Sequence, residues 1–350
     1  MDIFNIILIS VLSLFNNWTI SNIHSTISNN LNNIKIENQN KILEKEKRKN
    51  KQNKIIVKNL YYKENNNKEK YNRIFQLKPF KDNLFRFKWW IIKSIYNWDI
   101  DYIDFSIKRD VEDRDEIDVK KVYDNYIEKI NNDNRQDLSF KTTLWKQYYW
   151  EVKNNKINNK DVKIVLFYFH WMGGNRHQWI NDYTFWWNFN RIQNLMIKNK
   201  WVYISPDFRD FTDKWPMEMF ILLKKKIQEY PNAQIYLSSA SSGWTLLWRL
   251  MNNEEMKNKI NGIILLGSVT NLYNTIYDKN IPIYVWHWTR DPNIAYTNKI
   301  KFYLRMKNRN INYPIKIELF QWWVHGTPIR MVNWKSIINW ILQQNNTFVK

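Results

Sequence analysis

The chain has 350 residues, a formal net charge of +21, 20 Trp, 6 Gly and no Cys. The hydrophobic fraction of 44% excludes a wholly disordered chain, and the lack of Cys excludes disulfides, Cys-ligated zinc and a thiol nucleophile. A chain of this length carries roughly 25 Gly at average usage. Because glycine is the residue that most readily adopts positive φ in turns, this shortfall is the most informative feature of the composition.

The positive charge has two interpretations. It favours a nucleic-acid or anionic-surface partner, or it reflects an AT-rich gene. The 50 Asn and 3 Ala favour the second interpretation, since Asn, Lys and Ile have AT-rich codons. The basic residues are scattered and no nucleic-acid-binding module accompanies them. We therefore expect no nucleic-acid partner.

The N-terminal part of the chain divides into two segments. Residues 3–15 form an apolar run with the length of a secretory h-region, so residues 1–17 are predicted to be a signal peptide or a short membrane anchor. Residues 18–74 are rich in Asn and Lys without apolar periodicity, which predicts a disordered linker. The expected location is exported or membrane-anchored, with peripheral or anchored membrane association, and the cytoplasm is the alternative.

Residues 75–350 are predicted to form one domain, with an N-terminal extension at 75–136 and a core at 137–345. Within this domain, residues 119–130 fit an amphipathic helix. Residues 140–152 alternate well enough for a hairpin or a pair of strands.

From residue 163 onward, apolar runs alternate with helical stretches. This order predicts an α/β fold with a mostly parallel central sheet and helices on both faces. The expected strands lie at 163–170, 201–208, 233–239, 261–269, 281–287 and 315–321. The expected helices lie near 189–199, 217–229, 243–258, 295–308 and 333–343.

Four segments follow predicted strands in this part of the chain. They are HWMGG (170–174), SASSGW (239–244), HWTRDP (287–292) and QWWVHGTP (321–328). In this order they resemble the active-site loops of the α/β-hydrolase family, in particular its esterase-like and lipase-like members, over residues 137–345. The resemblance implies an α/β-hydrolase fold and a serine hydrolase that cleaves carboxylic esters through an acyl-enzyme.

The family pattern implies a role for individual residues. Ser241 in the nucleophile elbow would attack the ester carbonyl, His325 would accept and return its proton, and Asp291 would orient His325. The backbone N–H groups of Met172 and Ser242 would bind the oxyanion. The residues that would support these loops are His170, Trp171, Gly173, Gly174, Gly243 and Trp244.

Tryptophan stands at several positions where the family pattern has glycine. Read with glycine, HWMGG becomes HGMGG, and SASSGW becomes SASSGG, which is close to the elbow motif G-x-S-x-G. We hypothesise that the gene reads UGA as glycine and that its translation used tryptophan. The alternative is a Trp-rich protein with aromatic clusters, as in a carbohydrate-binding surface. The positions concerned are Trp171, Trp244, Trp288, Trp322 and Trp323.

Other functions are compatible with the same four segments. A peptidase or an acyltransferase would use the same fold and triad, and an inactive α/β-hydrolase could serve as a binding module. The expected partner is a small-molecule ester. We expect no cofactor and no metal, because Cys ligands are absent and the His residues lack the close pairing of a zinc-binding helix. The sequence predicts no particular oligomeric state.

Overall fold

The structure is a computed structural model that describes residues 90–104, 127–142, 146–208, 214–270, 280–321 and 327–347. All of them belong to the unit Lys70–Lys350. The predicted signal peptide or anchor and the predicted linker lie outside the described residues. Among the described residues, no helix combines the length and apolar character that crossing a membrane requires.

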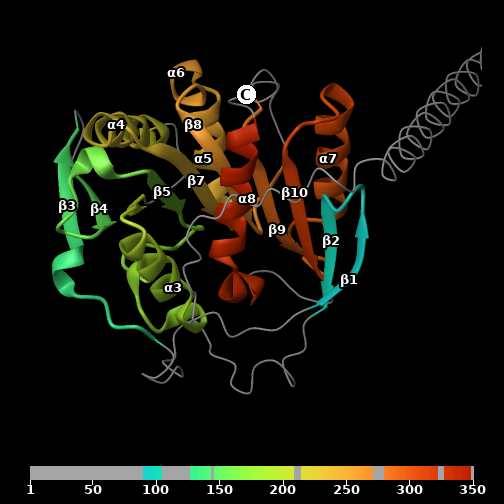
Figure 1. Cartoon of the computed structure of the whole chain (residues 1–350), viewed down its shortest axis with the longest axis horizontal. Coiled ribbons are helices and arrows are strands. Elements are labelled where there is room, and N and C mark those ends of the chain that lie inside the picture. The colour runs from blue at the N-terminus through green and yellow to red at the C-terminus, as the bar shows by residue number, and fades with distance from the viewer. Residues whose placement is uncertain are drawn as a thin grey trace, which may run out of the picture. The chain divides into compact units, whose positions relative to one another are not determined.

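The strands of the described residues form one ten-stranded sheet (Figure 1). They are β1 (Trp90–Ile95), β2 (Ile100–Asp104), β3 (Arg135–Lys141), β4 (Lys146–Val152), β5 (Ile164–Phe169), β6 (Val202–Pro206), β7 (Gln234–Ala240), β8 (Ile260–Leu266), β9 (Ile283–Trp288) and β10 (Ile315–Phe320). Their order in the sheet is β1-β2-β10-β9-β8-β7-β5-β6-β4-β3. The strands from β2 to β6 in that order are parallel, whereas β1, β4 and β3 each pair antiparallel with a neighbour. The mostly parallel sheet expected from the sequence is confirmed.

The central strands are apolar along their whole length. Every residue of β5 and of β9 is buried. Helices cover both faces of a parallel sheet, so both sets of alternating side chains enter a core and the strand sequence does not alternate. Each of the six predicted apolar runs therefore overlaps one of the strands from β5 to β10.

Helices form a layer on each face of the sheet (Figure 1). Side chains of α4, α5 and α7 enter one hydrophobic core, and side chains of α3 and α8 enter the other. The α-helices are α3 (Thr184–Lys198), α4 (Lys214–Glu229), α5 (Trp244–Met251), α6 (Glu254–Lys257), α7 (Thr297–Arg309) and α8 (Trp334–Thr347). The short 3-10 helices are η3 (Asn132–Asn134), η4 (Asn159–Asp161), η5 (Gln178–Ile180), η6 (Ser241–Gly243) and η8 (Thr327–Met331).

The helix predicted at 243–258 is interrupted. It forms α5 and α6, which are separated by Asn252 and Asn253. The Asn253 side chain accepts a hydrogen bond from the Met256 backbone N–H at 3.2 Å and so caps the start of α6. Asparagine favours such caps over helix interiors, which explains the break.

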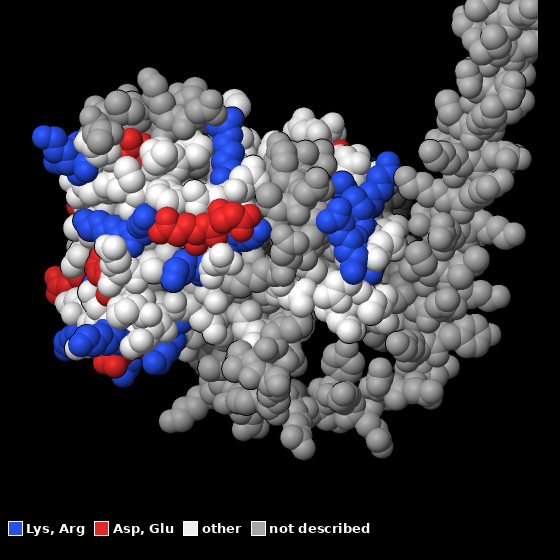
Figure 2. Space-filling model, turned by 90° about the horizontal axis from the view of Figure 1, so that it is seen from above, with Lys and Arg blue, Asp and Glu red and all other residues white. Residues whose placement is uncertain are grey.

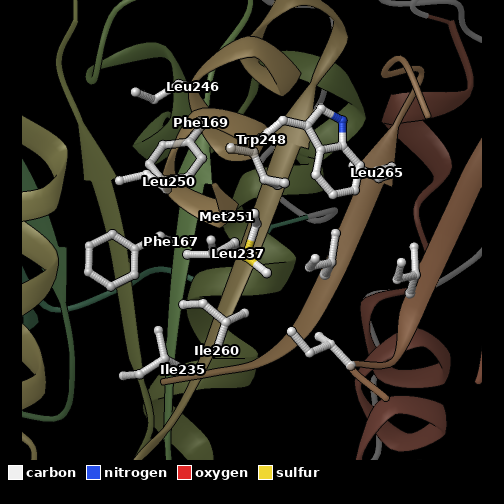
Figure 3. Close-up of a cluster of buried hydrophobic side chains, with 14 of the residues drawn as sticks. Phe167, Phe169, Ile235, Leu237, Leu246, Trp248, Leu250, Met251, Ile260 and Leu265 are labelled. Carbon is white, nitrogen blue, oxygen red and sulfur yellow. The ribbon is translucent and has the colours of Figure 1, made fainter. Parts of the chain in front are cut away.

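Helix α5 is anchored on the middle of the sheet (Figure 3). Its Leu246, Leu250 and Met251 lie among Phe167 of β5 and Leu237 of β7. Complete burial of one such side chain contributes roughly 1.5–3 kcal/mol. This packing fixes the helix that begins directly after the segment SASSG.

The pair of strands predicted at 140–152 is found as β3 and β4, although β3 begins earlier, at Arg135, and the helix predicted at 119–130 is not found in its described part. Residues 127–130 are not helical, and residues 119–126 lie outside the described residues. The Asn190 side chain of α3 donates to the Glu128 carbonyl at 2.8 Å and accepts from the Glu128 N–H at 3.0 Å. These bonds replace those that a helix would form within itself.

The hairpin of β1 and β2 extends the sheet beyond β10 and was not expected. Strand β2 pairs in parallel with β10, from Ile100 opposite Ile317 to Ile103 opposite Phe320. Lys316 of β10 adds an ion pair to Asp101 at 2.5 Å. The sequence of β2, IDYID, has Asp at two of its five positions, so its composition does not indicate a buried strand.

Acidic and basic side chains both lie on the described surface. On the face shown in Figure 2, acidic side chains lie among basic ones over one part, and a group of basic side chains lies apart from them over another. The surface pair of Lys224 and Glu255, 2.9 Å apart, is one place where the signs mix. The expected absence of a nucleic-acid partner stays a prediction.

Candidate active site

The loops that carry three of the four sequence motifs lie at the same edge of the sheet. Strands β5, β7 and β9 are parallel members of one sheet, so their carboxyl ends point in one direction. Ligands of open α/β sheets bind outside that edge. Strand β10, which precedes the fourth motif, ends at the same edge, but residues 322–326, including His325, Trp322 and Trp323, lie outside the described residues.

Ser241 occupies a strained turn between a strand and a helix. Strand β7 ends at Ala240, and α5 begins at Trp244. Ser241 has φ +44°, in the left-handed region. For a residue with a Cβ this conformation costs roughly 1–2 kcal/mol. A strained serine on a sharp strand-to-helix turn is the geometry of the nucleophile elbow.

Gly243 allows this turn to approach the end of β5. A Cβ on Gly243 would lie 2.6 Å from the carbonyl oxygen of His170 and 3.0 Å from the carbonyl carbon of Phe169. No side chain fits at those distances, so the glycine sets how closely the two loops meet. Trp244, the next residue, is partly buried and packs against the core on the α5 side of the sheet.

The core of the sheet runs β3-β4-β6-β5-β7-β8-β9-β10, and the serine turn follows its central strand β7. Helices cover both faces, and β5 is followed by a glycine-containing loop beside the serine. The chain has the α/β-hydrolase fold. In this fold the nucleophile stands at the top of the sheet and the loop after the third core strand supplies an oxyanion donor.

Solved structures similar to this chain include bacterial and archaeal esterases. An esterase of Pyrococcus furiosus is 16% identical, with a TM-score of 0.44, and the match covers 62% of this chain and 96% of that one. Esterase 2 of Thermogutta terrifontis is 14% identical, with a TM-score of 0.42, and the match covers 62% and 92%. The same esterase phosphorylated by paraoxon is 13% identical, with a TM-score of 0.42 over 62% and 92%. No protein-family model and no curated protein matches the chain.

The loop after β5 makes a tight turn over Trp171 to Gly174. The Gly174 N–H donates to the Trp171 carbonyl at 3.1 Å, and Gly173 has φ +77°. Positive φ at the third residue is the signature of a type II turn and requires glycine or asparagine. The Met172 N–H takes no part in the turn and donates to Ser242 Oγ at 2.6 Å. The structure thus brings the two predicted oxyanion residues together.

His170 holds the start of this loop. Its ring is buried and stacks on Phe208 at 3.7 Å between centroids. Burial lowers the pKa of His170 to about 4, although its bond to the Trp171 carbonyl and the charge of Asp207 act to raise it. The ring is therefore neutral at neutral pH. Nδ1 lies 2.8 Å from the Trp171 carbonyl oxygen, and we assign it as the donor because that oxygen can only accept.

Two of the tryptophans at glycine positions of the family pattern lie in aromatic packing. Trp171 meets Trp179 edge-on at 4.3 Å between ring centroids. Trp288 is fully buried and lies over Gly267, where a Cβ would come within 2.6 Å of an indole carbon. Three other tryptophans adopt positive φ, which is rare for bulky residues: these are Trp98 (+65°), Trp186 (+49°) and Trp187 (+49°).

Asp291 lies in the loop after β9 and its side chain is fully buried. Its Oδ1 accepts from the backbone N–H groups of Asn293 at 2.8 Å and Ile294 at 2.9 Å. Its Oδ2 lies 3.8 Å from His287 Nε2, which itself lies 2.9 Å from the Ile294 carbonyl oxygen. These contacts fix the orientation of the carboxylate. Among the described residues, no group of three or more His, Asp or Glu side chains could hold a metal ion.

A buried lysine beside Asp291 was missed by sequence reasoning. Lys299 of α7 is fully buried, and its amine donates to the Ser268 carbonyl. Burial lowers the pKa of Lys299 to about 7, while the charge of Asp291 acts to raise it. Ser268 Oγ donates in turn to the Ser239 carbonyl at 2.9 Å, two residues before Ser241. A lysine in an amphipathic helix is expected to be exposed, so nothing in the sequence indicates that Lys299 is buried.

Arg176 was also missed. Its guanidinium binds both carboxylate oxygens of Asp137, at 3.0 and 2.9 Å, and one of Asp207, at 3.0 Å. Arg176 lies just after the turn that contains Met172, while Asp137 belongs to β3 and Asp207 follows β6. The arginine thus ties the loop after β5 to two other parts of the sheet.

Proposed function

We propose that this protein is a serine hydrolase that cleaves carboxylic esters through an acyl-enzyme. The observation that carries the proposal is the left-handed conformation of Ser241 between β7 and α5. Strain of this kind persists only where the surrounding structure enforces it, and it concentrates at functional sites. The Met172 N–H near the same turn supplies the second element that acyl transfer needs.

In the proposed reaction, Ser241 Oγ attacks the carbonyl carbon of the ester while His325 accepts the hydroxyl proton. The carbonyl oxygen becomes an oxyanion. When the tetrahedral intermediate collapses, the C–O bond to the alcohol breaks and His325 gives its proton to the departing oxygen. Water then attacks the acyl-enzyme by the same steps, which releases the acid and restores Ser241.

Asp291 and two backbone donors would support these steps. Asp291 would hold the tautomer of His325 and stabilise the imidazolium, and a carboxylate already fixed by two backbone N–H groups suits that task. The N–H groups of Met172 and Ser242 would bind the oxyanion. Loss of one such donor typically lowers turnover by about 10²–10³.

The test is a comparison of Ser241→Ala with Ser336→Ala, an exposed serine on α8. We expect Ser241→Ala to abolish both hydrolysis of p-nitrophenyl esters and labelling by a fluorophosphonate probe, and Ser336→Ala to leave both unchanged. Hydrolysis or labelling that survives in Ser241→Ala would refute the assignment of the nucleophile. His325→Ala and Asp291→Asn should lower kcat strongly without unfolding the chain.

Activity assays on the wild-type protein distinguish the alternative functions. A panel of esters, peptides and acyl acceptors distinguishes an esterase from a peptidase or an acyltransferase, because the leaving-group preference resides in the pocket. A folded wild-type chain that takes no fluorophosphonate label would favour an inactive binding module instead.

A further inference from the structure

The Met172 N–H is a donor that the fold leaves available for one partner. Met172 is the second residue of the turn from Trp171 to Gly174, and the hydrogen bond of that turn uses the Gly174 N–H. The Met172 side chain is 71% exposed, so the loop around it faces solvent. The turn therefore presents one backbone N–H at the edge of the sheet where the serine turn lies.

The partner of this donor in the structure is the hydroxyl of Ser242. The Met172 backbone nitrogen lies 2.6 Å from Ser242 Oγ. Donors of an oxyanion hole lie about 2.7–3.1 Å from the place of the oxyanion. Ser242 Oγ therefore accepts the hydrogen bond that a substrate oxygen would need.

The backbone around both residues is fixed, so the contact does not depend on a loose loop. Gly243 lets the serine turn pack directly on the carbonyl oxygen of His170. On the other side, the His170 ring packs so closely on the turn that a Cβ on Gly174 would lie 2.9 Å from Nδ1. The one free element is rotation of the Ser242 side chain about χ1.

We propose that the Ser242 hydroxyl competes with the substrate for the Met172 N–H, so that each catalytic cycle begins with its displacement. This inference rests on the proposed function. In the free protein the Met172 N–H already donates to Ser242 Oγ. The substrate therefore gains only the difference in hydrogen-bond free energy between its own oxygen and Ser242 Oγ as acceptors. The Ser242 side chain thus sets a limit on how strongly the oxyanion hole stabilises the transition state.

Removal of the hydroxyl is expected to increase activity. One hydrogen bond between uncharged groups corresponds to about a 2- to 12-fold change in an equilibrium constant. We expect Ser242→Ala to raise kcat/KM for a p-nitrophenyl ester by about 2- to 10-fold. The Ki of an alkyl boronic acid, whose oxygen occupies the oxyanion hole, should fall by the same factor. Ser336→Ala, at an exposed position of α8 outside the candidate site, should resemble the wild type in both measurements.

A measurement without substrate keeps the proposal testable by itself. Amide hydrogen exchange at Met172 should be slow in the wild type and in Ser336→Ala, and faster in Ser242→Ala. Equal exchange in all three proteins would show that the hydrogen bond is absent and would overturn the proposal. A drop or no change in kcat/KM for Ser242→Ala would overturn it as well. Failure of the proposed function would show differently, as undiminished fluorophosphonate labelling of Ser241→Ala or no labelling of the wild type.

Discussion

Gly243 lies so close to the carbonyl oxygen of His170 that a methyl group on it would come within 2.6 Å of that oxygen. The contact joins the serine turn to the end of β5 through backbone atoms alone. Because neither side can rotate away, the approach of the two loops is set by the absence of a single carbon atom.

The first prediction tests this approach. Gly243→Ala should separate the serine turn from the loop after β5 and lower kcat/KM by about 10² or more, on the scale of losing one oxyanion donor. Gly262→Ala is the matched control, because a Cβ there meets a side-chain atom, Ile341 Cγ2 at 2.7 Å, and no backbone atom of a catalytic loop. The control should lose some thermal stability and keep its kcat/KM. Equal kcat/KM values for both variants would contradict the prediction.

The second prediction concerns Arg176. Arg176→Lys keeps the charge but loses the paired hydrogen bonds to Asp137, so the loop after β5 should be less well positioned. We expect kcat to fall about tenfold, since misplacement of catalytic groups has large effects on rate. Arg135→Lys, which loses a similar pair of bonds to Asp182, is the control. Comparable losses of kcat in the two variants would show a general effect on stability instead.

The third prediction concerns Lys299. The folded protein releases the amine proton near pH 7, whereas the unfolded chain keeps it to about pH 10.5, so the unfolded state binds more protons between these values. Stability should therefore rise with pH across this window, by about 5 kcal/mol at most. Lys299→Met should be more stable than the wild type at pH 7. Its free energy of unfolding, measured by urea denaturation, should not rise between pH 7 and 9. Lys301→Met, at an exposed position of the same helix, should keep it.

The fourth prediction has the opposite sign. Glu318 of β10 accepts from the Tyr284 hydroxyl at 2.5 Å, and burial raises its pKa to about 7, although this bond and Lys316 act to lower it. The unfolded chain loses this proton near pH 4.5, so the folded state binds more protons between pH 4.5 and 7 and stability falls as pH rises. In the wild type the free energy of unfolding should fall by about 3 kcal/mol as the pH rises from 4.5 to 7. Glu318→Gln should remove this fall. Glu255→Gln, on the surface, should not change the pH dependence of urea unfolding.

The fifth prediction concerns tryptophan. We propose that UGA codons of this gene encode glycine at several tryptophan positions, and Trp98 is the clearest of them. It is 66% exposed, has φ +65° and follows Asn97 in the turn between β1 and β2. Asn-Gly is the preferred pair in such a turn.

The gene and the natural protein decide this proposal. UGA codons at Trp171, Trp244 and Trp288, and also at the positive-φ positions Trp98, Trp186 and Trp187, are the expected result, together with peptide masses that show glycine there. UGG codons at Trp171, Trp244 and Trp288 would refute the proposal. The burial of Trp288 argues against glycine at that position, because glycine there would leave a cavity beside Gly267.

The strands of the sheet were predictable because of how a parallel sheet is buried. The run IVLFYF of β5 is apolar throughout and could be located without knowing its neighbours. Strand β2 was not predictable, since two of its five residues are Asp and its assignment depends on pairing with β10, more than 200 positions away along the chain.

The candidate site divides in the same way. The strand-to-helix turn at Ser241 could be located from a short motif, because such a turn places demands on its immediate neighbours. The bond from Met172 to Ser242, the clamp around Arg176 and the buried amine of Lys299 link residues far apart in sequence. Patterns of hydrophobicity indicate which residues are buried but not which partners they meet, so these contacts required the structure.

The hairpin of β1 and β2 changes where the folding unit begins. Because β2 pairs along β10, the strand that leads into the His325 loop is not an edge of the sheet. A chain that started at residue 137 would expose the backbone of β10, and an unpaired apolar edge strand invites pairing with other molecules. The hairpin of β1 and β2 therefore covers an edge of the sheet, and a truncation that removes this hairpin would expose β10 to pairing with other molecules.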